Sequence, residues 1–381
     1  MTPRFLCAAL ILALPGAALP AQIALSANDG KVVPADQPDA PRTADAIAVL
    51  RIGPAGARTL ATLPVPGTVV GPPGTVALTA DSRLAIITAG QMLNAGGTPE
   101  PADLVSVVDL RRPNTPRLIQ TLHAGAGAAG IAISPNGKLV LIANTNADSL
   151  SVFALARGRL TPVGTIALDP KSRPVDVGFA DAGRTAYVVA QGTNRLLRFT
   201  VAGLQLLPGS PIAIGAAPYS LAINPKTQIA YVSHLVGRAP AAAPGPRPGS
   251  IGIVDLKAGR MVGQIDTGVT PEHVGLSPSG RYLQVTVNNG STLPTRSPAF
   301  HDHGRMTVYR AMGDRLMPVA ETRTGRWCQG AVWRADETLL LLQCSYNKQI
   351  EPYRFDGHSL TAGEPITFDA RPGAIATARS R

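Results

Sequence analysis

Cysteine, tryptophan and long apolar stretches are scarce in this chain of 381 residues, and each scarcity excludes a class of protein. The sequence has three cysteines and two tryptophans, Trp327 and Trp333. No Cys-x-x-Cys-His sequence occurs, which excludes covalently attached haem. A quinone-dependent propeller is expected to contact its cofactor with tryptophans, and two are few for that purpose. We therefore expect no cofactor. Beyond the N-terminal segment, no apolar stretch has the length of a membrane-spanning helix.

Aromatic side chains and runs of like charge are also few. Phe, Trp and Tyr make up 4% of the chain, and no run of Lys or Arg exceeds two. The formal net charge is nevertheless +11, from 35 basic and 24 acidic side chains. Such a field attracts anions, including nucleic acid. Because the basic residues are scattered and have few aromatic neighbours to stack on bases, a solvated basic surface is favoured, and nucleic-acid binding stays a weaker alternative.

The N-terminal segment has the pattern of a secretory signal peptide. Arg4 gives a positive start and Phe5–Leu14 is an apolar stretch too short to span a bilayer. The small residues suited to cleavage are Ala17, Ala18 and Ala21. We therefore expect residues 1–21 to be a signal peptide and residues 22–381 to be a single periplasmic or secreted domain. An uncleaved N-terminal anchor is the alternative.

The cysteines agree with export. Cys7 would leave with the signal peptide, which leaves Cys328 and Cys344 at equal distances from Asp336 in a hairpin. Facing strands would bring them together, so a cross-strand disulfide is expected in an oxidising compartment. Two unpaired buried thiols are the alternative, and metal binding by two cysteines without a nearby His is less favoured.

Ala129–Thr145 is the stretch around which the chain is organised. Its two apolar arms flank a Ser-Pro-Asn-Gly turn, which indicates a β-hairpin buried on both faces. Helical periodicity is absent at useful length. Five further hairpins repeat the pattern: Val76–Ile87, Val175–Val189, Tyr219–Val232, His273–Val285 and Ala331–Leu342.

The spacing of these hairpins predicts an all-β, seven-bladed β-propeller of four-stranded antiparallel blades. Equivalent turn residues recur at intervals of about 44 to 57 residues, close to the period of a propeller blade. The N-terminal strands Gln22–Val33, Ala46–Ile52 and Arg58–Val65 lack an inner strand, and Gly373–Thr377 is an inner strand without partners. We expect the C-terminal strand to complete the N-terminal blade and close the ring.

The turns Ser134–Lys138 (SPNGK) and Ser277–Arg281 (SPSGR), and short strands such as Ser149–Leu155 (SLSVFAL), resemble the YVTN-type repeat of seven-bladed propellers. This group includes the propeller lactonases. The resemblance implies an Arg-His pair on one inner strand and a Glu after a second strand. Here the corresponding segments read GAAPYSL, at Gly215–Leu221, and Val232-Ser233-His234, without a carboxylate. If this chain is a lactonase of the 6-phosphogluconolactonase type, its catalytic residues must differ from those that the resemblance implies.

Long insertions indicate where function lies. All fall between the second and third strands of a blade, so they emerge on one face, which marks a binding face. They are Asp29–Thr43, Gly90–Asp103, Leu235–Gly249 and Gly290–His303.

Polar residues predicted at the channel mouth on that face suit an anionic or carbonyl-bearing ligand, or a peptide of a partner. The candidate binding residues are Arg173, Tyr219, His234, His273, Asn288, Arg326 and Tyr346. If the protein is a hydrolase, Glu272, His273 and His234 are the acid-base candidates. His301 and His303 are a weak candidate for zinc or copper, since adjacent loop residues are more often solvated.

The function expected from these observations is ligand or protein binding by an exported, monomeric propeller. The alternative is a lactonase-like hydrolase with a non-standard site. A third class is an accessory propeller that presents a redox partner.

Overall fold

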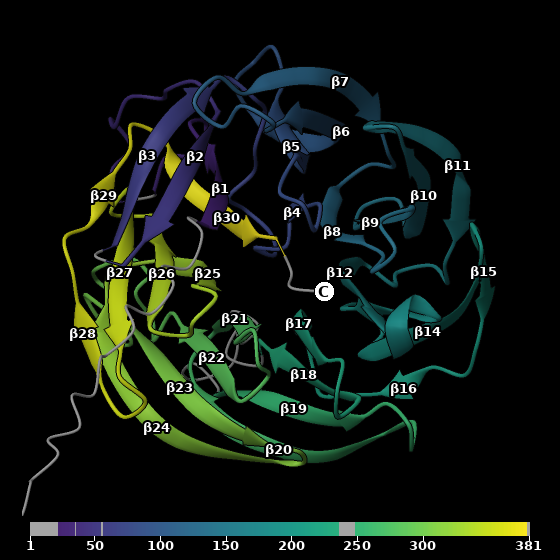
Figure 1. Ribbon diagram of the computed structural model, residues 1–381. Coiled ribbons are helices and arrows are strands. Elements are labelled where there is room, and N and C mark those ends of the chain that lie inside the picture. Colours follow the sequence, from purple (N-terminus) through teal and green to yellow (C-terminus); the bar gives the residue numbers. More distant parts are fainter. Residues whose placement is uncertain (1–21, 35, 55, 236–247, 379–381) are drawn as a thin grey trace, which may run out of the picture.

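The computed structural model describes residues 22–34, 36–54, 56–235 and 248–378. The predicted signal peptide and most of the predicted loop Leu235–Gly249 lie outside these residues. The described chain forms seven antiparallel sheets arranged as blades around a central axis (Figure 1). The prediction of an all-β propeller with seven blades is therefore confirmed. Its one described helix is the 3-10 turn Asp181–Gly183, and no helix of these residues is long and apolar enough to cross a membrane.

Each blade has strands a to d, counted outward from the axis. Blade 1 consists of β30 (Arg371–Thr377), β1 (Gln22–Asp29), β2 (Ala46–Gly53) and β3 (Gly56–Leu63). Blade 2 consists of β4 (Val76–Leu78), β5 (Leu84–Leu93), β6 (Pro99–Asp109) and β7 (Arg117–His123). Blade 3 consists of β8 (Ala128–Ile133), β9 (Leu139–Asn144), β10 (Ser149–Ala156) and β11 (Arg159–Ala167).

The other four blades follow the same order. Blade 4 consists of β12 (Pro174–Ala180), β13 (Thr185–Ala190), β14 (Arg195–Ala202) and a divided outer strand, β15 (Gln205–Pro208) and β16 (Ile212–Ala213). Blade 5 consists of β17 (Pro218–Asn224), β18 (Ile229–His234), β19 (Gly249–Asp255) and β20 (Arg260–Gly268). Blade 6 consists of β21 (Pro271–Leu276), β22 (Tyr282–Val287), β23 (Gly304–Met312) and β24 (Arg315–Thr324). Blade 7 consists of β25 (Cys328–Trp333), β26 (Leu339–Cys344), β27 (Gln349–Phe355) and a divided outer strand, β28 (Leu360–Ala362) and β29 (Ile366–Thr367).

The ring closes by pairing of the two ends of the described chain. β30 lies antiparallel to β1, with Ala24 opposite Thr377 and Ala27 opposite Ala374. Figure 1 shows this yellow strand beside the purple first strands. The predicted closure is confirmed, because the last strand supplies the inner strand that blade 1 lacks.

The core lies between the blades. Strand b of a blade is covered on both faces by neighbouring blades, as in β9, where all six residues are buried. One apolar cluster joins Leu141 of blade 3 to Val177 and Phe199 of blade 4. This two-sided burial explains why the b strands are nearly continuous in apolar residues instead of alternating.

Hydroxyl groups at the ends of b strands add hydrogen bonds between blades. Thr88 Oγ1 donates to the Ala129 carbonyl at 2.6 Å, and Thr145 Oγ1 donates to the Pro174 carbonyl at 2.7 Å. Ser345 Oγ makes the same contact to the Pro372 carbonyl, across the closure, at 2.6 Å. These bonds tie the loop-side end of each of these b strands to the inner strand of the next blade.

The outer edges of the blades are irregular. The c and d strands carry a β-bulge near the middle of their pairing in blades 1, 2, 3, 5 and 6. In blades 4 and 7 the outer strand is broken into two short pieces. A bulge bends and twists the strand that carries it. None of the seven described blades therefore ends in a straight, uninterrupted strand.

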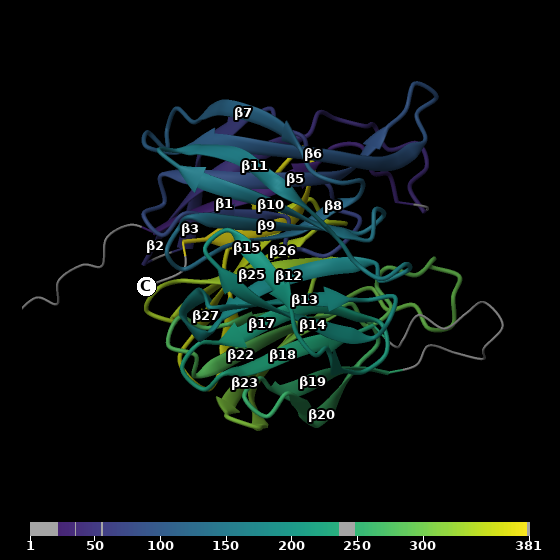
Figure 2. The same cartoon turned by 90° about the vertical axis from the view of Figure 1, so that its right-hand side faces the viewer.

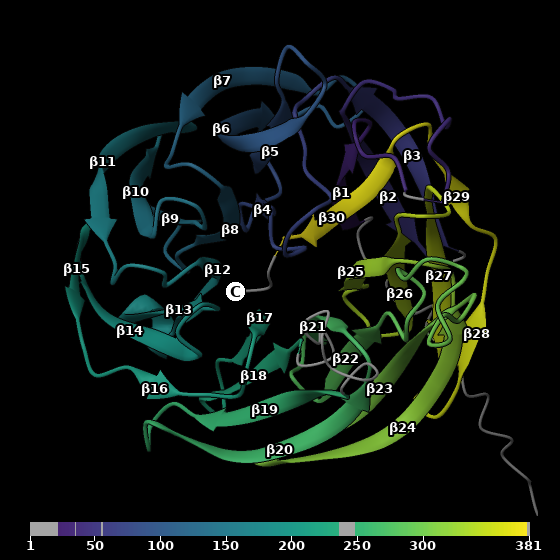
Figure 3. The same cartoon turned by 180° about the vertical axis from the view of Figure 1, so that it is seen from behind.

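The described insertions, within Asp29–Thr43, Gly90–Asp103 and Gly290–His303, emerge on one face, seen edge-on at the right of Figure 2 and face-on in Figure 3. We call it the loop-rich face. One insertion differs from its prediction as a loop. β5 continues to Leu93 and β6 begins at Pro99, so most of Gly90–Asp103 is an extended β-hairpin. Its residues can pair because a bulge between Ala89 and Gln91 absorbs the change of register.

Deletion of residues 371–381 should abolish the monomeric folded state. The deletion removes β30 and exposes the inner edge of β1, which would then pair with other molecules. Size-exclusion chromatography and circular dichroism should show aggregated or unfolded protein. Deletion of residues 379–381 alone leaves β30 intact and serves as the control. A folded monomer lacking residues 371–381 would contradict the role assigned to the closure.

Candidate functional site

The segment from Val65 to Thr75 lies against the inner strands of several blades on the loop-rich face. Gln329 Nε2 of blade 7 donates to the Val69 carbonyl at 3.0 Å. A Cβ on Gly373 of blade 1 would lie only 2.8 Å from Val69 Cα, and one on Gly74 would lie 2.9 Å from Asp176 Oδ1 of blade 4. The segment thus contacts inner strands on different sides of the axis. We call it the plug.

A buried ion cluster holds the plug. Lys31 Nζ lies 3.2 Å from Asp29 Oδ1 and 2.5 Å from Asp45 Oδ2, and all three side chains are at most 10% exposed. The same carboxylates accept hydrogen bonds from the plug, from the Val69 amide to Asp29 at 3.0 Å and from the Gly67 amide to Asp45 at 3.1 Å. Removing one partner from such a cluster would leave a buried charge uncompensated. The ions therefore fix the plug to the first insertion.

The sequence did not reveal the plug. It connects strand d of blade 1 to strand a of blade 2, whereas the insertions singled out all lie between strands b and c. Its composition, VPGTVVGPPGT, is rich in Pro and Gly and has no strand alternation. The one usable signal in the sequence is the absence of charged residues from this connection, and in the structure most of its residues are buried, unlike those of an ordinary surface loop.

His234 is fully buried inside blade 5. Its Nδ1 lies 3.1 Å from Ser250 Oγ, and its ring packs against Gly215 and Gly252, where a Cβ would overlap it. Burial lowers the pKa of His234 to about 4, so the ring is neutral at physiological pH. The structure places this candidate away from solvent.

The other acid-base candidates point to different partners. Glu272 is buried and accepts a hydrogen bond from Asn288 Nδ2 at 3.0 Å. His273 is half-buried, and its Nδ1 lies 3.0 Å from Gln284 Oε1. Burial lowers the pKa of His273 to about 4. A bulge between Pro271 and His273 interrupts the regular alternation of β21 at Glu272, and the two side chains are engaged by different partners.

Two of the predicted binding residues are brought together by the insertions of blades 1 and 6. The Arg326 guanidinium lies 3.6 Å from the centre of the Tyr346 ring and 4.9 Å from that of Phe300. Arg326 Nη2 also pairs with Asp36 Oδ2 at 3.0 Å, and Tyr346 donates its hydroxyl to the same oxygen at 3.1 Å. We call these four residues the clasp, since they join loops of blades 1 and 6 to blade 7.

The clasp lowers the pKa of Asp36. Partial burial alone would raise it, but hydrogen bonds from Arg326 and Tyr346 and the charge of Arg326 outweigh that effect. Among the other candidates, Arg173 is exposed and Tyr219 is buried. The clasp therefore unites Arg326 and Tyr346 but none of the remaining predicted binding residues.

His301 and His303 lie close together in the blade 6 insertion. Their ring centres are 6.0 Å apart, and His303 Nδ1 lies 2.7 Å from Asp302 Oδ1. Within the described ranges, neither histidine belongs to a group of three close metal-binding side chains. The structure places His303 instead in the wall of a cavity.

That cavity, about 340 Å³, lies at the loop-side end of blade 6. Its lining is Asn289, His303, Arg305, Glu321, Thr322 and Arg323. Arg305 at the start of β23 is directly opposite Arg323 near the end of β24. Like charges at directly opposed positions destabilise a sheet unless something compensates them.

The compensation within the cavity is partial. Glu321 Oε2 lies 3.6 Å from Arg305 Nε, too far for a hydrogen bond, and accepts one from Thr307 Oγ1 at 2.9 Å. Arg305 Nε is buried without a hydrogen-bond partner, while its Nη2 donates to the Thr267 carbonyl. The lining thus holds two guanidinium groups, an imidazole and the carboxylate of Glu321, and Asp302, outside the lining, pairs with the imidazole. Sequence reasoning missed it because Thr322 and Arg323 belong to an outer strand, not to an insertion.

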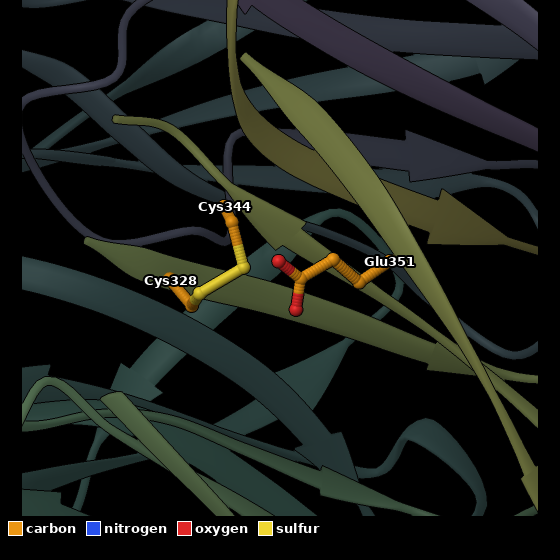
Figure 4. Close-up of side chains that lie close together, drawn as sticks. All are labelled: Cys328, Cys344 and Glu351. Carbon is orange, nitrogen blue, oxygen red and sulfur yellow. A yellow bond between two sulfur atoms is a disulfide. The ribbon is translucent and has the colours of Figure 1, made fainter. Parts of the chain in front are cut away.

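The structure joins Cys328 to Cys344 by a disulfide, at directly opposed positions of β25 and β26. Both cysteines are fully buried. Figure 4 shows that the Glu351 side chain of the neighbouring strand β27 points toward the sulfur atoms.

Comparison with known proteins supports the resemblance to lactonase-like propellers. Residues 106–204 match the family described as lactonase, 7-bladed β-propeller. A seven-bladed β-propeller protein of Mycobacterium tuberculosis is 28% identical over 149 residues, which are 39% of this chain and 34% of the relative. The match thus spans about a third of that relative's length.

Solved structures share the whole fold at low identity. A putative 6-phosphogluconolactonase of Bacteroides uniformis superposes with a TM-score of 0.72 at 18% identity, covering 94% of this chain and 99% of its own. The periplasmic gluconolactonase of Pseudomonas aeruginosa gives 0.68 at 14% identity, with the same coverage. At such identities the likeness concerns the fold.

Gly215→Ala should destabilise the protein by about 1 to 3 kcal/mol, because the added Cβ overlaps the buried His234 ring and forces it to move. Thermal unfolding would measure the loss. Gly164→Ala is the matched control, since nothing lies within 4 Å of a Cβ there. Equal stability of the two variants would show that His234 has room to shift.

Asp36→Asn should lower stability at neutral pH by at most about 1 kcal/mol, as for partly exposed ion pairs. Since the folded state lowers the pKa of Asp36 below its ordinary 3.8, the carboxylate stabilises the fold above that pH. The contribution is lost as the pH falls through the folded-state value. Melting temperatures of the variant and the wild type should therefore converge in acid. Asp39→Asn, on the same loop, is the control, and a difference that persists in strong acid would refute the assignment.

Proposed function

We propose that this protein is an exported, monomeric propeller that binds a small anion in the blade 6 cavity of its loop-rich face. The observation that carries the proposal is the pair Arg305 and Arg323, directly opposed across two strands, with Glu321 too far from Arg305 Nε for a hydrogen bond. An anion between the two guanidinium groups would relieve their repulsion. Arginine binds carboxylate and phosphate through paired hydrogen bonds.

Three features favour the blade 6 cavity, and not the channel mouth, as the binding site. The plug covers Gln329 and the inner strands it contacts, the clasp already engages Arg326 and Tyr346, and His234 is buried. The overall basic charge, +11, would raise the local concentration of anions. His303 and Asn289 add polar groups to the cavity from the insertion side.

Hydrolysis of a sugar lactone is the second candidate. It is favoured by the similarity of the fold to a putative 6-phosphogluconolactonase and to a periplasmic gluconolactonase. The burial of Glu272 and the separate hydrogen-bond partners of Glu272 and His273 weigh against it. Sustained turnover of gluconolactone or 6-phosphogluconolactone, lost in His273→Ala, would establish the hydrolase and overturn a role in binding alone.

Arg323→Gln should weaken binding of 6-phosphogluconate or inorganic phosphate about tenfold or more, because one charge-assisted hydrogen bond contributes about 1.5 to 3 kcal/mol. Isothermal titration calorimetry at low salt would measure it. Arg310→Gln is the control, since Arg310 is exposed on the same blade but outside the cavity lining. Equal losses in both variants would indicate a diffuse charge effect, and no loss in either would refute the site.

A further inference from the structure

Three potential metal ligands converge in blade 7, on three neighbouring strands. Cys328 lies on β25, Cys344 on β26 and Glu351 on β27 (Figure 4). One ligand atom from each lies within 4.8 Å of the other two. In the part of the chain that the structure describes, this is the one such group of His, Cys, Asp and Glu side chains.

The carboxylate of this group is held in place by its neighbours. Gln349 Nε2 donates to Glu351 Oε1 at 3.0 Å, and the Tyr353 hydroxyl donates to Oε2 at 2.6 Å. The Gly325 amide reaches both oxygens, at 3.1 and 3.2 Å. Hydrogen bonds of this kind orient ligands in metal sites and strengthen them. Glu351 is also partly exposed, which gives an ion a route to the buried sulfur atoms.

The disulfide masks these ligands, because its sulfur atoms are bonded to each other. A phosphine reductant breaks the S–S bond, takes an oxygen atom from water to become a phosphine oxide, and leaves two thiols that carry the two hydrogens of that water. Ionising both thiols beside a carboxylate would gather three negative charges in a largely buried place, which is unfavourable. A divalent cation removes that penalty.

We propose that the reduced protein binds one thiophilic divalent ion, such as Zn²⁺ or Cd²⁺, through Cys328, Cys344 and Glu351. Two protons leave the thiols as two metal–sulfur bonds form, and water completes the coordination. Thiolate ligands select Zn²⁺ and Cd²⁺ over Mg²⁺ and Ca²⁺, which prefer oxygen. The site is independent of the blade 6 cavity, and formation of the disulfide closes it.

The test is a Cd²⁺ titration of the full mature chain, reduced with a phosphine and freed of it without air. The reduced protein should take up one Cd²⁺ with the ultraviolet charge-transfer absorption of a cadmium–thiolate bond, and Zn²⁺ should displace it. The oxidised protein should show no such band. Circular dichroism would establish that the reduced chain stays folded.

Glu351→Gln separates the proposed site from simple thiol reactivity. Loss of one charged ligand should weaken binding at least about tenfold, within the range seen when even outer-shell partners are removed. Glu364→Gln, an exposed carboxylate of the same blade, is the control, and Cys328→Ser should abolish the band. A folded, reduced protein without the band, or equal affinity in wild type and Glu351→Gln, would overturn the proposal.

Discussion

The pairing of β30 with β1 is the interaction on which the rest of the structure depends. Every other blade is formed from consecutive strands, so only blade 1 needs residues from both ends of the described chain. Because each blade buries its b strand against both neighbours, a gap at one position would expose apolar surface on two blades. The apolar core is therefore fully buried only when all seven blades are in place and the ring is closed.

Close packing at the loop-side ends of the blades engages many of the polar side chains there. The polar residues there bond to neighbouring blades, as the hydroxyls of Thr88, Thr145 and Ser345 do. In the plug and the clasp, further polar groups, such as Asp29, Asp45 and Arg326, are engaged in holding loops in place. The side chains that hold this end together are thereby removed from the surface. Partly compensated positive charge remains at Arg305 and Arg323.

The sequence predicted the fold well because the fold follows from local patterns. Apolar hairpins at a regular spacing specify the blades, and an inner strand without partners specifies the closure. The site was harder to predict, because the position of a residue along a strand does not determine whether its side chain faces solvent or the blade interior. His234 ends a b strand, as expected for a mouth residue, but Gly215 and Gly252 leave space for its ring inside the blade. The opposition of Arg305 and Arg323 depends on strand register, which residue spacing alone leaves open.

The bulged and divided outer strands affect how the protein meets other polypeptide chains. The rim of the disc consists of edge strands with unpaired backbone groups, and such edges can template growth of a sheet by another chain. A bulge in five blades and a break in the other two leave no straight stretch long enough to recruit a passing unfolded polypeptide. The irregular outer strands thus protect the perimeter of the disc from edge-to-edge pairing without a partner that covers it.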